Sequence, residues 1–238
     1  MLELCFWNYL ATDRFKKLQP EVFLNPEELQ EWNRFKIPNR RDEWLASRWL
    51  AKQVILRSTG QPEARANTIQ IMRDVSGKPR AAERGEPCGS LSLAHTAGAA
   101  LVGFSMDAGS VFGCDLEKIA QHSAAFLSDY FTDDERDWLA GQQDLALTGS
   151  LLWSSKESVL KALGRGLSVD TRQVECQPWK ESPVHTAGWQ QFDVRVMNFP
   201  AEFPVLWRVV DGFVLTVCPL PGIESLNISL SILDSAAD

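Results

Sequence analysis

The sequence lacks the features that mark exported, membrane-spanning and zinc-binding proteins. Its five cysteines are odd in number and scattered, and no Cys-x-x-Cys spacing occurs, so neither a disulfide framework nor a zinc site is indicated. No apolar run approaches the ~20 residues that a membrane helix needs. The first residues lack the basic segment of a signal peptide. We therefore expect a cytoplasmic protein with no membrane partner.

Two further absences narrow the class of ligand. No Gly-x-x-x-x-Gly-Lys loop occurs, which argues against a P-loop phosphotransferase. The net charge of −7 argues against a dedicated nucleic-acid binder. Residues 34–84, however, carry twelve of the 24 Lys and Arg and only five acids. This excess fits a compact anionic ligand or an acidic protein partner, and it equally fits a solvated basic helix face.

The pattern of apolar residues predicts a mixture of helices and strands without regular alternation. That mixture favours the α+β class over a doubly wound sheet. We expect an N-terminal half at 1–108 and a C-terminal half at 109–238. The expected strands are 3–9, 69–71, 91–93, 99–104, 111–117, 192–197, 206–210, 214–218 and 226–233. One expected helix begins at Asn25-Pro26, and three others span 42–58, 126–131 and 147–163. A further helix is expected to begin at Thr132 with a capping box.

The segment at 113–117 reads Gly-x-Asp-x-Glu. On a strand, Asp115 and Glu117 point to the same face, about 6.6 Å apart, and could both ligate one hard cation. Apolar neighbours indicate at least partial burial, where two like charges repel and a divalent ion would offset the cost. An edge strand with two exposed acids is the alternative, and the pair alone favours it.

Two other segments carry potential chemistry. In Trp-x-x-Lys-Glu-x-x-x-Lys at 153–161, Glu157 and Lys161 share a helix face, which also describes an ordinary surface ion pair. His95 stands in the expected turn 95–98 between two apolar strands, where it could contact a phosphate or simply occupy a turn.

The ordered series of these segments resembles the Sfp-type branch of the phosphopantetheinyl transferase superfamily. Gly-x-Asp-x-Glu is followed about forty residues later by Trp-x-x-Lys-Glu-x-x-x-Lys, as in that superfamily. Upstream, the Gly-Lys-Pro turn at 77–79, the strand ending at His95 and Arg48 in a basic helix are similar to elements of the branch. Downstream, Phe131-Thr132 with Glu135 resembles its F-x-x-x-E stretch.

The resemblance implies two similar α+β halves related by a pseudo-twofold axis, with coenzyme A in the cleft between them, in a monomer. It implies that Asp115, Glu117 and Glu157 hold one Mg²⁺, and that Arg48, Lys78, His95 and Lys161 contact coenzyme A. The implied reaction transfers 4′-phosphopantetheine to a serine of an apo acyl or peptidyl carrier protein and releases adenosine 3′,5′-bisphosphate. Asp115, Glu157 and Lys161 form the catalytic set. Glu157 is the expected base, and Lys161 stabilises or protonates the leaving phosphate.

Two positions depart from the family pattern. Some members offer lysines of the first helix to the 3′-phosphate, where this chain has Glu28 and Glu31, so Arg34 or Arg40 would have to replace them. Ala94 stands where a serine often precedes the histidine, and Thr96 could supply that contact.

The segment 118–130, with Phe126 and Leu127, resembles the region where family members meet the carrier, and it also reads as a plain linker and helix. Alternative functions are another Mg²⁺-dependent phosphotransferase, a non-catalytic module that binds coenzyme A or carrier proteins, and a structural α+β domain.

Overall fold

The computed structural model describes residues 1–166, 169–176, 188–220 and 227–234. The chain forms two compact units. The N-terminal unit comprises Met1–Ser110 and Ser225–Asp238, and the C-terminal unit comprises Val111–Glu224. The observed division after Ser110 lies two residues from the predicted one. The tail, which we expected in the second half, belongs to the N-terminal unit because strand β11 (Ile228–Leu233) pairs with the first strand of the chain.

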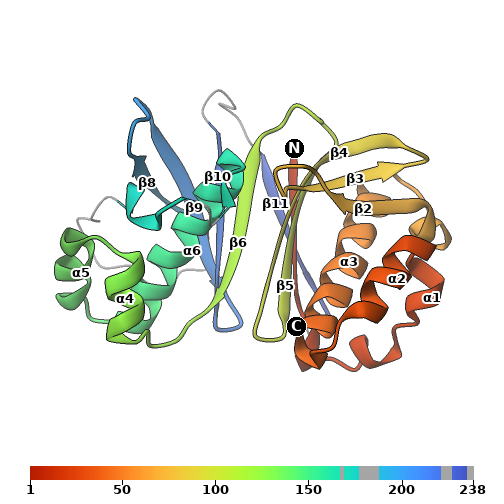
Figure 1. Ribbon diagram of the computed structural model, residues 1–238, viewed down its shortest axis with the longest axis horizontal. Helices are drawn as coiled ribbons and strands as arrows, with labels where there is room; N and C mark the ends of the chain where they lie inside the picture. The colour runs from red at the N-terminus through yellow and green to blue at the C-terminus, as the bar shows by residue number, and fades with distance from the viewer. Residues whose placement is uncertain (167–168, 177–187, 221–226, 235–238) are drawn as a thin grey trace. The chain divides into compact units, whose positions relative to one another are not determined.

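The N-terminal unit is a six-stranded sheet covered by helices (Figure 1). Its strand order is β11-β1-β5-β4-β3-β2, antiparallel except for the parallel pair β1 and β11. Its helices are α1 (Pro20–Phe23), α2 (Pro26–Arg34) and α3 (Pro38–Ser58). Its strands, besides β11, are β1 (Leu2–Asn8), β2 (Ile69–Arg73), β3 (Pro79–Glu83), β4 (Glu86–Thr96) and β5 (Ala99–Ser105). Short 3-10 turns lie at Tyr9–Ala11, Phe15–Lys17 and Glu63–Thr68.

Proline positions explain where the N-terminal helices begin. Asn25 caps α2 and Pro26 follows at its first position, as predicted, and Glu28 completes a capping box with Asn25. Helix α3 begins at Pro38, four residues before the predicted start at 42, because proline is pre-organised for the first turn of a helix.

The C-terminal unit is a five-stranded antiparallel sheet with the order β6-β10-β9-β8-β7. Its helices are α4 (Ala124–Tyr130), α5 (Asp133–Ala140) and α6 (Leu145–Leu163), with a 3-10 turn at Thr171–Gln173. Its strands are β6 (Phe112–Lys118), β7 (Val174–Cys176), β8 (Gln190–Val196), β9 (Glu202–Val210) and β10 (Phe213–Pro219). The predicted capping box at Thr132 is present, and Gly164 ends α6 in the left-handed conformation.

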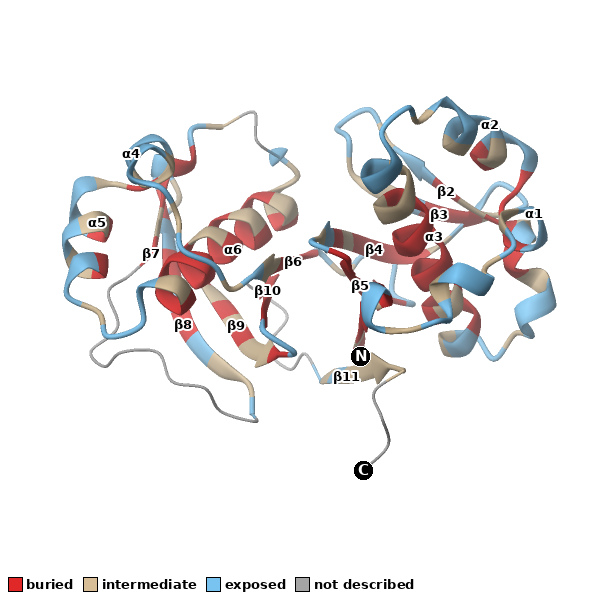
Figure 2. Ribbon diagram, turned by 90° about the horizontal axis from the view of Figure 1, so that it is seen from below, coloured by how far each residue is buried: buried red, intermediate tan, exposed pale blue. Residues whose placement is uncertain are grey.

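Each unit is built around one long, deeply buried helix (Figure 2). Most residues of α3 from Trp44 to Leu56 and of α6 from Leu147 to Ala162 are buried. Each helix packs against its own sheet, so that the apolar core of each unit lies between that helix and the strands. Within the described ranges, no helix is long and apolar enough to cross a membrane.

The two units repeat the same order of elements. Each runs from a strand through two short helices and one long helix to four further strands. The sheet order β1-β5-β4-β3-β2 of the first unit corresponds, strand for strand, to β6-β10-β9-β8-β7 of the second. The α+β class with two similar halves is therefore confirmed, while the pseudo-twofold axis and the cleft between the halves stay predictions.

Matching hairpins fix which residues of the two units correspond. The turn Ala97-Gly98 and the turn Asp211-Gly212 both have two residues with positive φ, the conformation of a type I′ hairpin. Directly after these turns, Ala99 pairs with Asn8 and Phe213 pairs with Lys118. Asn8 therefore corresponds to Lys118, and the rest of β1 and β6 follows residue by residue.

The long helices also share a sequence pattern that we had not recognised in the sequence. Helix α3 reads Trp-x-x-Lys-Gln-x-x-Leu-Arg at 49–57, and α6 reads Trp-x-x-Lys-Glu-x-x-Leu-Lys at 153–161. Aligning Lys52 with Lys156 matches Trp49 with Trp153 and Leu56 with Leu160. The two units are thus two versions of one fold.

Candidate functional site

The candidate site lies where α6 crosses β6 inside the C-terminal unit. A side chain at Gly113 would collide with the Ser158 carbonyl oxygen and the Ala162 amide nitrogen. Glycine at this position therefore lets the helix backbone come unusually close to the strand. Gly113, the first residue of the Gly-x-Asp-x-Glu motif, thus lets Asp115 and Glu117 come within reach of α6.

Three side chains along one face of α6 meet the two carboxylates of β6. Lys161 Nζ lies 2.6 Å from Asp115 Oδ1, and the Trp153 indole nitrogen donates to Glu117 Oε1 over 3.1 Å. Glu157 stands one helical turn from each, at positions i+4 and i−4, so it lies between them along the helix. Asp115 and Glu117 therefore share a face of β6, as the alternation of strand residues predicted.

Burial and mutual repulsion weaken the acidity of two of these carboxyl groups. Loss of water, followed by the charge of Asp115, raises the pKa of Glu117 to about 8. The same two causes raise the pKa of Glu157 to about 7. Burial alone would lower the pKa of Lys161, but Asp115, Cys114 and Glu157 outweigh it and raise that pKa. The site therefore combines a permanent cation with carboxyl groups poised near neutral pH.

Two carboxylate oxygens at the site have no partner. Asp115 Oδ2 and Glu157 Oε1 are buried and accept no hydrogen bond among the described residues. Buried unpaired oxygens of this kind are the hard donors that Mg²⁺ prefers. As the side chains stand, no three His, Cys, Asp or Glu residues in the described ranges gather closely enough to hold a metal ion. The ammonium group of Lys161 lies against Asp115 instead.

The corresponding positions of the N-terminal unit carry no carboxylates. Cys5 corresponds to Asp115 and Trp7 to Glu117 by the strand register, and Gln53 corresponds to Glu157 by the helix alignment. Trp7 and Trp49 pack together with ring centroids 4.6 Å apart, where the C-terminal unit has Glu117 bonded to Trp153. The positions of Asp115, Glu117 and Glu157 are therefore acidic in the C-terminal unit and not in the N-terminal one.

In the N-terminal unit, Arg48 is a buried cation on α3. Its guanidinium lies 4.5 Å from the centroid of the Trp44 ring, and its Nε has no hydrogen-bond partner among the described residues. Burial lowers the pKa of Arg48 to about 10, against the opposing charges of Glu31 and Glu28, so it stays protonated at neutral pH.

Lys78 and His95 lie at two other places of the same unit. Lys78 ends a tight turn in which the Asp74 carboxylate accepts from the backbone nitrogens of Ser76 and Lys78, and burial lowers the pKa of Lys78. His95 belongs to β4 rather than to the turn that we predicted, because the chain reverses over only two residues. Its Nδ1 lies 3.5 Å from a carboxylate oxygen of Glu43.

The two acids at the expected lysine positions are engaged in holding α2 to its neighbours. Glu28 is buried and bonds Lys52 and the backbone of Ile71. Glu31 accepts from the Trp44 indole nitrogen over 3.1 Å. The Glu28 carboxylate is therefore held inside the N-terminal unit, whereas Glu31 is exposed and bonded to Trp44.

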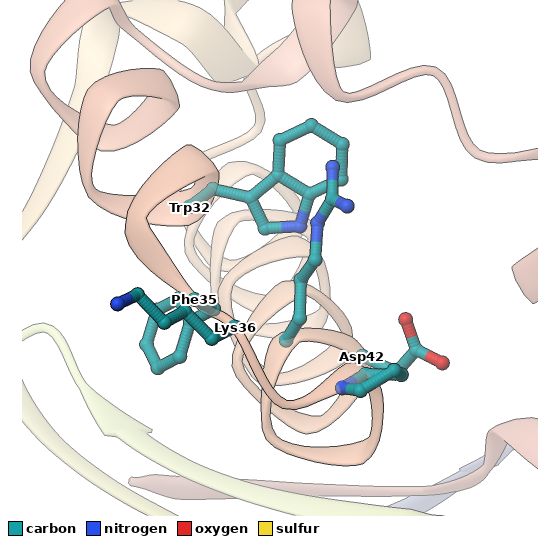
Figure 3. A pocket seen from close by; sticks show the side chains of 6 residues that line it. Trp32, Phe35, Lys36 and Asp42 are labelled. Carbon is teal, nitrogen blue, oxygen red and sulfur yellow. The ribbon is translucent and has the colours of Figure 1, made fainter.

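A cavity of about 300 Å³ lies between the end of α2 and the start of α3 (Figure 3). The Arg41 guanidinium stacks 3.7 Å from the centroid of the Trp32 ring. The cavity is lined by Trp32, Phe35, Lys36, Pro38, Arg41 and Asp42. Trp32 Nε1 and Arg41 Nε are both buried and have no hydrogen-bond partner in the part of the chain that the structure describes. The cavity is basic and aromatic, and no motif in the sequence indicated it.

The predicted carrier-docking segment forms helix α4, and Phe126 points inward from it. Phe126 stacks on His122 with centroids 4.6 Å apart and packs edge-on against Trp153 at 5.1 Å. Its ring therefore supports the tryptophan that bonds Glu117, so this part of the segment braces the site.

The sequence patterns did not reveal the roles of three residues near the site. Gly113 and Trp153 belong to the quoted motifs, and only the packing shows what each does. Lys156 is fully buried against Glu135. The helical spacing of Lys156 from the buried Leu152 and Leu160 was the available signal, since all three share one face.

Comparisons with known proteins agree with this site. Residues 111–218 match the family model of the 4′-phosphopantetheinyl transferase superfamily. A Synechocystis sp. protein, provisionally named as a 4′-phosphopantetheinyl transferase, is 27% identical over 158 residues, which are 65% of this chain and 62% of that protein. The chain thus spans less than two thirds of that relative's length.

Among solved structures, the holo-[acyl-carrier-protein] synthase of Thermotoga maritima aligns with a TM-score of 0.35 and 20% identity. The alignment covers 46% of this chain and 62% of the synthase, and a score this low supports no structural conclusion.

The matched range 111–218 contains all of β6 and α6, and hence every side chain of the acidic crossing. Through residues 111–218 of its C-terminal unit, the chain is similar to the 4′-phosphopantetheinyl transferase superfamily.

Proposed function

We propose that the protein is an Sfp-type transferase that moves 4′-phosphopantetheine from coenzyme A to a serine of an apo acyl or peptidyl carrier protein. The observation that carries the proposal is the crossing of β6 and α6, where Asp115, Glu117, Glu157 and Lys161 come together. Phosphoryl transfer depends chiefly on positioning and on neutralising charge, and this set offers both.

The proposed reaction begins with the serine hydroxyl of the carrier. Its oxygen attacks the β-phosphate of coenzyme A, a new P–O bond forms, and the bond to the bridging oxygen of the pyrophosphate breaks. The serine proton passes to Glu157, whose pKa of about 7 suits a general base at neutral pH. Adenosine 3′,5′-bisphosphate leaves with the electrons of the broken bond.

Lys161 is placed to act on the leaving phosphate through its charge. Its raised pKa keeps the ammonium protonated, which favours electrostatic stabilisation over donation of a proton. Asp115 holds this ammonium at 2.6 Å in the free protein. We expect Lys161 to leave Asp115 for the phosphate when coenzyme A binds.

Asp115, Glu117 and Glu157 are the residues that would hold Mg²⁺. The unpaired oxygens of Asp115 and Glu157 fit such an ion, because a divalent cation would satisfy them and relieve the repulsion that raises the pKa of Glu117. When bound, the metal supplies Lewis-acid charge to the pyrophosphate oxygens.

The remaining phosphate contacts are proposed for cations of the N-terminal unit. Arg48, Lys78 and His95 are the candidates, and Arg48 is the best supported, because its buried Nε has no partner among the described residues. We place the reaction in the cytoplasm, in keeping with the five cysteines that the structure describes, which form no disulfide. A monomer is proposed because one chain already contains both versions of the fold.

The proposal is tested by mixing the protein with coenzyme A, Mg²⁺ and a panel of apo carriers from fatty-acid, polyketide, nonribosomal-peptide and lysine biosynthesis. Intact-mass measurement should show a gain of one phosphopantetheine on at least one carrier, and the gain should be absent with EDTA. If no carrier in the panel gains mass while coenzyme A still binds, the protein is a binding module and the transferase proposal is wrong.

A further inference from the structure

The same buried hydrogen-bond network occurs in both units, built around one glutamate and one lysine. Glu28 and Lys52 form it in the N-terminal unit, and Glu135 and Lys156 in the C-terminal unit. All four residues are at most 3% exposed. We refer to each network as a clamp.

The two clamps agree atom for atom. One carboxylate oxygen of the glutamate accepts from the lysine, over 2.5 Å for Lys52 and 2.7 Å for Lys156. The same oxygen accepts from the N-cap backbone of its own short helix, at Asn25 and at Thr132.

The remaining bonds of each clamp reach two further segments. The other carboxylate oxygen accepts from a strand backbone nitrogen, over 3.0 Å from Ile71 in β2 and 2.8 Å from Cys176 in β7. Each lysine also donates to a carbonyl oxygen, that of Phe23 over 2.7 Å and that of Thr171 over 3.2 Å. A clamp therefore ties the long helix to a short helix and to the strand at one edge of the sheet.

A buried ammonium held at fixed points sets both the rotation and the axial position of its helix. On α6, Glu157 directly follows Lys156, and Lys161 comes five residues later, toward β6. On α3, Arg48 precedes Lys52 by one helical turn, and the charge of Glu28 acts on it. The functional groups of each helix thus lie close along the chain to its clamped lysine.

We infer that Lys156 and Lys52 are positioning residues that serve different steps of the proposed transferase reaction. The C-terminal clamp sets Glu157 and Lys161, and so controls the rate of transfer. The N-terminal clamp sets Arg48, and so controls the affinity for coenzyme A. The inference rests on the proposed function.

Matched double variants test the inference, E135Q/K156M and E28Q/K52M. Replacing both partners removes the ion pair without leaving a buried unpaired charge, and glutamine can still cap its helix. Both should unfold at a lower temperature than the wild type. Val205→Ala in β9, a fully buried position that pairs with Phe192 and with no clamp residue, is the control for loss of stability alone.

We expect E135Q/K156M to lower kcat per folded molecule by about tenfold or more, with KM for coenzyme A within roughly twofold of the wild type. E28Q/K52M should do the reverse, with KM and the calorimetric Kd for coenzyme A raised by about tenfold and kcat kept. Val205→Ala should change neither constant. If a double variant does not fold, Lys156→Arg and Lys52→Arg, which keep the ion pair and change its geometry, carry the same comparison.

The inference is overturned if both variants keep kcat and KM per folded molecule, or if both change the same constant. Wild-type turnover reports separately on the proposed function. If the wild type modifies carriers and the two double variants do not differ in which constant they change, the positioning role of the clamps is wrong. The proposed transferase function is then unaffected.

Discussion

Glu157 is the residue on which the proposed chemistry depends most directly. Replacing it with glutamine keeps its shape and removes the proton acceptor, so kcat should fall by about 10²–10⁴-fold while coenzyme A still binds. The matched control is Glu175→Gln on β7, an acid with no part in the proposed site. Steady-state kinetics with a responsive carrier measures both. Turnover of the Glu157 variant near the wild-type rate would remove Glu157 from the role of base.

The acid pair at the crossing also predicts how stability depends on pH. Because folding raises the pKa of Glu117 to about 8 and of Glu157 to about 7, the folded state holds more protons than the unfolded state between their ordinary value of 4.5 and these values. The free energy of unfolding should therefore fall as the pH rises through this window.

Urea unfolding at about pH 5.5 and about pH 8.5 measures this fall against a Glu117→Gln/Glu157→Gln variant, which should show a smaller one. Adding MgCl₂ at the higher pH should stabilise the wild type and leave the variant unchanged, since a ligand stabilises only the state that binds it. Equal pH dependence in both proteins would contradict the raised pKa values.

At the scale of elements, the close approach of α6 to β6 depends on one missing side chain. Gly113→Ala places a methyl group against the Ser158 carbonyl and should reduce the free energy of unfolding by about 1–3 kcal/mol. Gly141→Ala, where a side chain meets only ordinary contacts, should change it by less than about 0.5 kcal/mol. Chemical denaturation compares the two. If both substitutions change the free energy of unfolding equally, α6 and β6 can move apart around the added methyl group without loss of stability.

The elements that the sequence predicted well are those with a local physical signal. Asn25-Pro26 and Thr132 with Glu135 mark helix starts by capping, and both are found in that role. Strand β3 was missed because Pro-Arg-Ala-Ala-Glu has little preference for a strand and becomes one only by pairing with β2 and β4. The three-residue β7 is likewise set by its partner.

The site residues likewise divide into those that a local sequence pattern predicts and those whose contacts depend on the tertiary structure. The spacing of Asp115 and Glu117 fixed their shared face, and that prediction was confirmed. The engagement of Glu28 with Lys52 and of Glu31 with Trp44 could not be foreseen, because each bond joins residues from different helices.

For the whole molecule, the tail joins the far ends of the sequence. Strand β11 pairs with β1 from Leu2 to Trp7, the Trp7 indole donates to Asp234, and Arg14 forms an ion pair with the same residue. Deleting the chain from 228 onward should expose the edge of β1 and speed hydrogen exchange at its amides, while the amides of β6 keep their protection. Equal exchange at β1 in both proteins would show that β11 contributes nothing.

Because that strand completes the N-terminal sheet, the middle of the chain is an insertion within the unit that surrounds it in sequence. On the ribosome, the segment 111–224 emerges ahead of β11. The inserted unit can therefore begin to fold while the first sheet still lacks the strand at its edge, and the sheet that forms first in sequence is completed after the one inserted into it.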